Sequence, residues 1–258
     1  MITDTTAIVL KTVPFSESSL IVTLLTEKHG KLAVMARGAR RSKNRFGGLL
    51  QPGAILDTTY YYKTTRDVQN LSEAAQNRPT WRIHQHIEKM ALGLVTLEFC
   101  EQLCHEFEPM PEISSFLRDF LGWLHDTSSN TRYLFPYIQF RLAQLAGIGI
   151  AWEVDESPGQ SVSDSSCENE PNTPFACYLN VESGSIARLA DGGLSFGLTK
   201  SQHDYLRYIA EGRKFMLLTT AFPSSDVRNL IHHLDAYFQF HLEGIRERRS
   251  DAIFQQIL

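Results

Sequence analysis

The sequence contains little cysteine. Its 258 residues include four cysteines, of which no two form a Cys-x-x-Cys pair: Cys100, Cys104, Cys167 and Cys177. A chain of this length buries a core without covalent cross-links, whereas disulfide frameworks are typical of short secreted chains. We therefore expect a reducing, cytoplasmic environment. Cys100 and Cys104 lie four residues apart in an apolar segment, where we expect small buried hydrophobes rather than metal ligands.

Long apolar runs are also absent. No segment approaches the roughly 20 apolar residues that a membrane-spanning helix needs. Residues 1–13 lack a basic segment followed by an apolar core and a cleavage site, so we expect no signal peptide. With 43% hydrophobic and 21% charged residues, the composition is typical of a soluble globular protein, and we expect no membrane partner.

Catalytic motifs are missing as well. The sequence contains no Gly-x-Ser-x-Gly, His-Glu-x-x-His or Gly-x-Gly-x-x-Gly motif, and residues 192–201, GGLSFGLTKS, lack the Gly-Lys-Ser order of a phosphate-binding loop. Because triads assemble from distant positions, these absences alone do not exclude an enzyme. No set of residues indicates one, however, and we predict a protein without catalytic residues, cofactor or metal ion.

One stretch, residues 28–55, contains no acidic residue, although the whole chain has a net charge of -4. Its positive charge comes from seven side chains: Lys28, Lys31, Arg37, Arg40, Arg41, Lys43 and Arg45. A cationic region on an acidic protein is typical of a surface that faces a polyanion, most often nucleic acid. The alternative is a solvated, charged loop beside a hairpin.

Short segments rich in β-branched residues precede residue 80. They are residues 5–13, 18–26, 32–36, 54–62 and 68–74, with Gly, Pro and Asn between them. Five such segments predict a small closed β-barrel, and the OB barrel is the commonest small barrel that binds oligonucleotides. The basic stretch would form a loop between the third and fourth strands. Within it, Phe46 is either a surface on which a base stacks or a plug under the loop.

From residue 80 onward the hydrophobic period changes from two to about 3.6. We expect a long helix within residues 81–106 that is apolar nearly all round in its middle, and further helices within residues 113–124, 132–146, 201–211 and 224–244. The sequence thus predicts an α+β protein. A five-stranded OB-fold domain, residues 1–79, would be followed by a helical domain, residues 80–258.

Four short motifs follow one another between residues 16 and 52. They are Ser-Glu-Ser-Ser, Thr-Glu-x-x-Gly-Lys, Gly-Ala-Arg-Arg before a basic run, and Leu-Gln-Pro. In this order and spacing they resemble the N-terminal domain of the RecO family of bacterial recombination mediators. The apolar helix end FRLAQLAGIGI, residues 140–150, is similar to the family as well. The resemblance implies an OB fold, a helical domain, and non-catalytic binding of single- and double-stranded DNA with annealing of complementary strands.

The resemblance also implies protein partners: RecR, the single-strand-binding protein SSB and, in some members, RecF. In the family an acidic SSB C-terminal tail docks on the helical domain, and such a site needs an apolar pocket rimmed by cations. Arg132 and Arg141 are candidates for that rim by location, and the alternative is that both are ordinary surface charges. The rival to the whole interpretation is a protein-interaction scaffold whose basic loop binds an acidic protein partner without a DNA role.

An acidic insertion lies within residues 151–200. Residues 153–174 contain six carboxylates and no Lys or Arg, and we expect a loop there, followed by a hairpin about Gly184. Many RecO proteins are similar here but carry two Cys-x-x-Cys pairs that hold zinc, whereas this chain has only Cys167 and Cys177. A structural zinc site needs four ligands, so we interpret the region as a degenerate zinc ribbon held by packing. Its charge prompts the hypothesis that the insertion masks the basic stretch.

Overall fold

The computed structural model describes residues 1–44, 46, 48–152 and 175–258. The described residues do not include Arg45, nor residues 153–174 with Cys167, so the predicted loop and the masking hypothesis lie outside them. The chain divides into two compact units, a barrel unit of Met1–Ser128 with Glu247–Ile257 and a helical unit of Ser129–Arg246 with Leu258. We predicted a domain boundary after residue 79, and the barrel unit continues past it to include the first two long helices.

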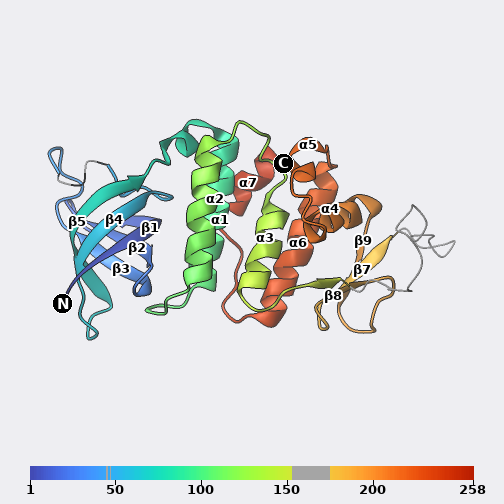
Figure 1. The fold of residues 1–258 in the computed structure, drawn as a ribbon. Coiled ribbons are helices and arrows are strands. Elements are labelled where there is room, and N and C mark those ends of the chain that lie inside the picture. The colour runs from blue at the N-terminus through green and yellow to red at the C-terminus, as the bar shows by residue number, and fades with distance from the viewer. Residues whose placement is uncertain (45, 47, 153–174) are drawn as a thin grey trace. The chain divides into compact units, whose positions relative to one another are not determined.

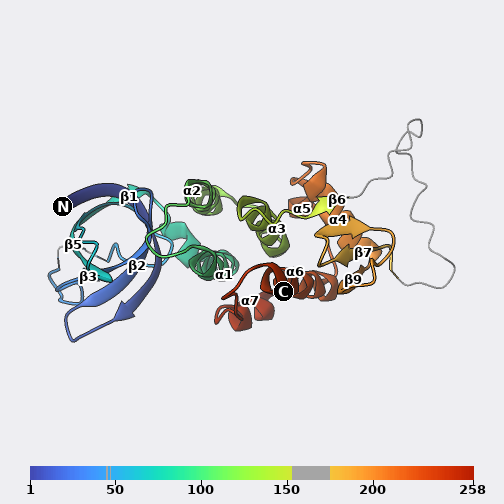
Figure 2. The ribbon, with the colours of Figure 1, turned by 90° about the horizontal axis from the view of Figure 1, so that it is seen from below.

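The barrel unit begins with a closed five-stranded barrel, in which the strand order is β1-β2-β3-β5-β4 (Figures 1 and 2). Its strands are β1 (Ile2–Pro14), β2 (Leu20–Thr26), β3 (Gly30–Ala36), β4 (Ile55–Tyr61) and β5 (Val68–Arg78). All neighbours are antiparallel except β3 and β5, which pair in parallel and close the barrel. The prediction of a five-stranded OB-fold barrel is confirmed.

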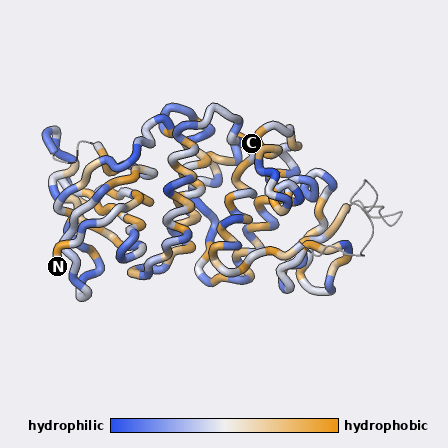
Figure 3. The backbone as a smooth tube through the Cα atoms, in the orientation of Figure 1, coloured by the Kyte–Doolittle hydropathy of each residue, from blue (hydrophilic) through white to orange (hydrophobic). Residues whose placement is uncertain are grey.

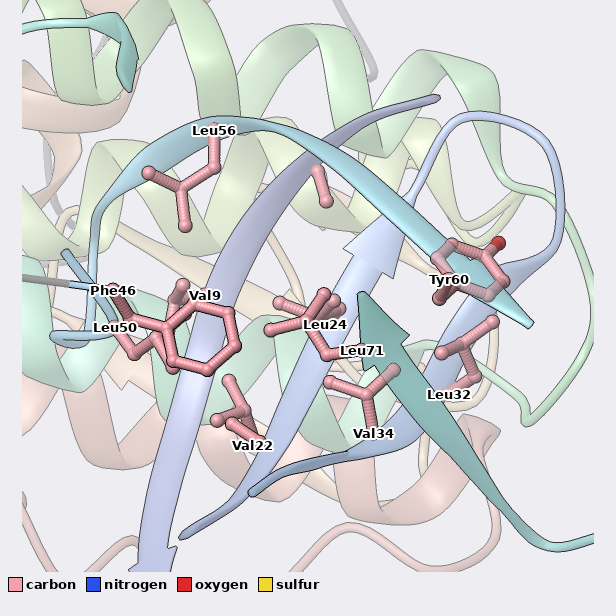
Figure 4. Packing of buried hydrophobic residues seen from close by; sticks show 12 residues of the cluster. Val9, Val22, Leu24, Leu32, Val34, Phe46, Leu50, Leu56, Tyr60 and Leu71 are labelled. Atoms are coloured by element: carbon pink, nitrogen blue, oxygen red, sulfur yellow. The ribbon is translucent and has the colours of Figure 1, made fainter. Parts of the chain in front are cut away.

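The barrel interior is filled by one face of each strand. In β3, buried and half-buried residues alternate along the whole strand, as expected for a period of two. The long β1 serves two neighbours, since its first half pairs with β4 and its second half with β2, with a register shift between Val9 and Lys11. Phe46 and Leu50, from the connection between β3 and β4, complete the cluster of buried side chains (Figure 4).

Helices make up the rest of the barrel unit. A 3-10 turn, η1 (Trp81–Gln85), leads into α1 (Ile87–Leu103), which is followed by α2 (Pro111–Asp126), and the C-terminal α7 (Asp251–Ile257) packs against α1. The middle of α1 is buried or half-buried at every position, as predicted, and Figure 3 shows the hydropathy along its backbone. The single helix expected within residues 81–106 is shorter, because His86 is extended and because residues after Cys104 pair with β3 instead.

The helical unit combines four helices and a small sheet among its described residues. The helices are α3 (Phe135–Leu145), α4 (Lys200–Ala210), α5 (Met216–Thr219) and α6 (Ser224–His241). The sheet has the order β6-β8-β7-β9, with β6 (Ala151–Trp152), β7 (Cys177–Asn180), β8 (Ser185–Ala187) and β9 (Ser195–Leu198). The hairpin predicted about Gly184 is formed by β7 and β8. None of the described helices is long and apolar enough to span a membrane.

Candidate nucleic-acid interface

Strand β3 separates the predicted cations into two groups. Lys28 and Lys31 lie at its start, whereas Arg37, Arg40, Arg41 and Lys43 follow its end. A strand of 7 residues spans about 20 Å at roughly 3.3 Å per residue. The stretch that reads as one basic run in the sequence therefore contributes to two ends of the barrel, which we call the covered end and the basic end.

The covered end is closed by the segment that follows α1. The backbone N–H of Phe107 donates to the Lys31 carbonyl oxygen at 2.8 Å, and the Lys31 ammonium donates to the Glu101 carbonyl oxygen at 2.6 Å. Gly30 has a φ of +64°, and a Cβ there would lie 1.9 Å from the Glu108 carbonyl oxygen. The backbone of Glu108 thus lies so close to Gly30 that only glycine fits. The Lys31 ammonium group makes an internal hydrogen bond.

Aromatic side chains pack beside this contact. The rings of His29 and Tyr62 are stacked with centroids 3.9 Å apart, and His29 Nδ1 lies 2.7 Å from the Tyr60 hydroxyl oxygen. Burial and the neighbouring charge of Lys28 lower the pKa of His29 below its usual value. The covered end is therefore a packed structural region in which Lys28 is the exposed cation of the predicted set.

The basic end brings together the β1–β2 loop and the turn after β3. The backbone N–H of Arg40 donates to the Ser18 carbonyl oxygen at 3.1 Å, and its guanidinium donates to the Ser16 carbonyl oxygen. Within the loop, the Phe15 N–H donates to the Ser19 carbonyl oxygen at 3.1 Å. Arg40 thus holds the loop through two hydrogen bonds, which position residues 15–19.

Charge at the basic end is strongly one-sided. The turn cluster consists of four exposed cations: Arg37, Arg40, Arg41 and Lys43. On the facing loop, Glu17 is the single carboxylate of residues 15–19. Exposed cations clustered on one surface produce a local positive potential even on an acidic protein.

A hollow of about 400 Å³ lies between the loop and the turn. The residues that line it include one aromatic, one methionine, two arginines and three serines: Phe15, Ser16, Ser18, Ser19, Met35, Arg37, Gly38 and Arg41. Phe15 is 62% exposed. The sequence analysis did not include Phe15 among the candidate residues. A signal of its exposure was present, because it follows Pro14 at the strand end and precedes the polar residues Ser16 and Glu17.

The structure decides between the two alternatives for Phe46, a stacking surface or a plug under the loop. The side chain is only 2% exposed and belongs to the barrel core with Leu50 (Figure 4). The Asn44 side-chain oxygen accepts the backbone N–H of Phe46 at 2.8 Å, which fixes the chain where it turns inward. Of the two alternatives, the structure has the plug under the loop, because burying an aromatic ring is more favourable than exposing it to water. Phe46 in this position offers no face to a base.

The two candidate partner residues belong to the helical unit. Arg132 lies three residues before α3, and Arg141 lies in the last turns of that helix, where its guanidinium donates to the Gln144 side-chain oxygen at 2.5 Å. Both are half-buried. Arg132 thus precedes the start of α3, whereas Arg141 lies near its end.

Cys100 and Cys104, which we expected to be small buried hydrophobes, are both buried. Burial raises the pKa of Cys104 to about 11 and raises that of Cys100 as well, so neither thiol is poised to ionise. Cys177 is buried in the small sheet. In that region the rings of Phe196 and His233 stack 4.6 Å apart. Among the described residues, no group of three His, Cys, Asp or Glu side chains is arranged to hold a metal ion.

Comparison with known families covers nearly the whole chain. The model of the family described as "Recombination protein O N terminal" matches residues 1–79, and that described as "Recombination protein O C terminal" matches residues 84–251. Among curated proteins named "DNA repair protein RecO", that of Chloroherpeton thalassium is 26% identical over 265 residues, covering 100% of both chains. That of Exiguobacterium sibiricum is 30% identical over 261 residues, covering 100% of this chain and 98% of the relative. That of Salinibacter ruber is 36% identical over 162 residues, covering 63% and 62%.

Proposed function

Because the chain belongs to the RecO family and has the role in DNA repair that its relatives' names describe, we propose that it is a non-catalytic DNA-binding mediator of recombinational repair. It binds single- and double-stranded DNA at the basic end of the barrel and anneals complementary strands. The observation that carries the proposal is the turn cluster of Arg37, Arg40, Arg41 and Lys43, exposed opposite a loop with one carboxylate. Two residues of the set predicted from the sequence are left out of this site: Lys31, which donates to the Glu101 carbonyl oxygen, and Phe46, which is buried.

The binding energy in this proposal is mainly electrostatic. Cations that neutralise phosphates release condensed counterions, so affinity falls with salt by roughly 0.7 in the log-log slope per phosphate on single strands. If three to four cations of the turn cluster contact phosphates, the slope is roughly -2 to -3. Arginine suits this role because its planar guanidinium binds phosphate oxygens in pairs and stacks on bases.

Annealing follows from the same charges. Two complementary strands repel each other through their phosphates, and a cationic surface that holds both lowers this repulsion. Sequence specificity is weak in this mechanism, because phosphate contacts position DNA without reading its bases.

Protein partners are proposed from the family resemblance. The chain would act with RecR and the SSB C-terminal tail, and RecF is a further candidate. The affinity of an acidic SSB tail peptide for wild type and for an Arg132→Ala/Arg141→Ala variant tests the candidate rim. Equal affinities would place the tail site elsewhere.

A salt series of fluorescence anisotropy on a labelled single strand tests the DNA proposal. The variant Arg41→Ala/Lys43→Ala removes two exposed cations from the basic end, and the matched control Lys28→Ala/Lys63→Ala removes two exposed cations outside it. We expect the first variant to bind more weakly and to shift the slope by about 1.4. The control should change both quantities much less.

Two outcomes would contradict the proposal. If the wild type binds no oligonucleotide at low salt, the protein-interaction scaffold becomes the better account, and the acidic partner has to be sought directly. If the two double variants lose equal affinity, binding depends on the overall charge of the protein, and the basic end is not the site.

A further inference from the structure

Phe15 is an exposed aromatic side chain on the β1–β2 loop, at the edge of the hollow. A single exposed Phe on a protein surface needs no explanation by itself. This one, however, shares its hollow with Met35 and with two arginines of the turn cluster. Aromatic rings and guanidinium planes beside a cationic track are the groups on which proteins stack the bases of single strands.

The backbone around Phe15 is held in place before any ligand arrives. Ser19 N–H donates to the Ser16 hydroxyl oxygen at 3.2 Å, which closes the loop on itself. Arg40 then ties the loop to the turn after β3, through its backbone N–H to Ser18 and its guanidinium to Ser16. A preformed site loses less conformational entropy on binding than a flexible loop.

We propose that this hollow receives one unpaired nucleobase, with a face of the base stacked on Phe15 and the flanking phosphates on Arg37 and Arg41. The inference rests on the proposed function and names its preferred substrate as single-stranded DNA. The volume of about 400 Å³ lies within the roughly 300 to 1,000 Å³ of clefts that bind small molecules. Glu17, the carboxylate of the loop, is not part of the lining, so the flanking phosphates do not face it within the hollow.

Duplex DNA cannot use the hollow in this way. Bases inside a duplex are paired and stacked on both faces, and a protein reaches a base face only after the base has left the stack. The turn cluster therefore binds phosphates of either form, whereas Phe15 adds affinity only for unpaired strands. This division of roles predicts that one substitution changes the preference between the two forms without removing charge.

The test compares Phe15→Ala and Phe15→Trp in the full-length chain. The probes are a labelled single strand, a blunt duplex of the same sequence, and a single strand with abasic sites. The aromatic control is Tyr61→Ala, which removes a 47% exposed ring at the end of β4. Because Phe15 is also exposed, thermal unfolding should be nearly unchanged in Phe15→Ala, and this is measured alongside.

We expect Phe15→Ala to bind the single strand about 5- to 150-fold more weakly, the range observed when one stacking side chain is removed. Duplex affinity should change less than about twofold, the salt slope should stay at its wild-type value, and Phe15→Trp should keep single-strand affinity. The abasic strand should bind wild type and Phe15→Ala equally.

The failure of this inference can be told apart from the failure of the proposed function. Salt-sensitive binding that weakens in Arg41→Ala/Lys43→Ala but is unchanged in Phe15→Ala would keep the DNA site and overturn the stacking role. Equal losses for the single strand and the duplex in Phe15→Ala would also overturn it. A wild type that binds none of the three probes would remove the proposed function and this inference together.

Discussion

The two ends of β3 carry residues that look alike in the sequence and are used differently in the structure. At the covered end, Lys31 donates to a carbonyl oxygen of α1, and Gly30 lies against the backbone of Glu108. At the basic end, the turn cluster is exposed beside a hollow, and a Cβ at Gly38 would meet, among the described residues, only the Arg41 side chain within 4 Å. The cations that follow one another in the sequence therefore do not form one surface patch. Strand β3 lies in the middle of the run and places its two halves at opposite ends of the barrel.

The largest effect we expect concerns two phenylalanines, Phe46 in the barrel core and Phe15 at the basic end. Phe46→Ala should lower the free energy of unfolding by about 3 to 5 kcal/mol, because it leaves a cavity in the barrel core. Phe15→Ala should change it by no more than about 0.5 kcal/mol, since the side chain is exposed. Urea denaturation of both variants measures the difference. Similar losses for the two would mean that Phe15 also belongs to the core and would weaken its proposed role in binding.

A smaller effect should separate the two glycines that flank β3. Gly30 and Gly38 both have positive φ, at +64° and +75°. Gly30→Ala should cost about 3 kcal/mol, because left-handed strain adds to an overlap with backbone atoms that cannot move independently. Gly38→Ala should cost about 1 kcal/mol, from the strain alone. Denaturation midpoints, compared at equal m-value, give the loss of unfolding free energy for each variant. Equal losses for Gly30→Ala and Gly38→Ala would show that the covered end is not tightly packed.

The smallest effect should appear in the titration of His29. Burial first, and the charge of Lys28 second, lower the pKa of His29 below 6.5. The unfolded chain then binds this proton more readily than the folded chain, so the contribution of His29 to stability is present above pH 6.5 and declines as the pH falls below it. Lys28→Ala should raise the pKa of His29 towards its usual value, whereas Lys43→Ala should leave it unchanged. NMR titration of the imidazole in both variants checks the comparison.

Local pattern determined much of this protein. The period of two in residues 1–79 and the longer period after residue 80 were enough to predict five strands followed by helices, because each period follows from how side chains project from the backbone. The β7–β8 hairpin about Gly184 was predicted in the same way, from a turn residue between two short apolar runs. The order of short motifs also indicated the family.

Contacts between distant residues decided the rest. Contacts between segments far apart in the chain determine that Phe46 points inward. They also determine where α1 ends and which cations share a surface. After Cys104 the chain has left the helix, and the Phe107 N–H donates to the carbonyl oxygen of the distant Lys31 rather than to a helical carbonyl. The hollow beside Phe15 is lined by residues of both the β1–β2 loop and the turn after β3, two segments that Arg40 joins. Hydrophobic period and charge are properties of the chain itself, whereas a site needs two segments to meet, and only the tertiary structure brings them together.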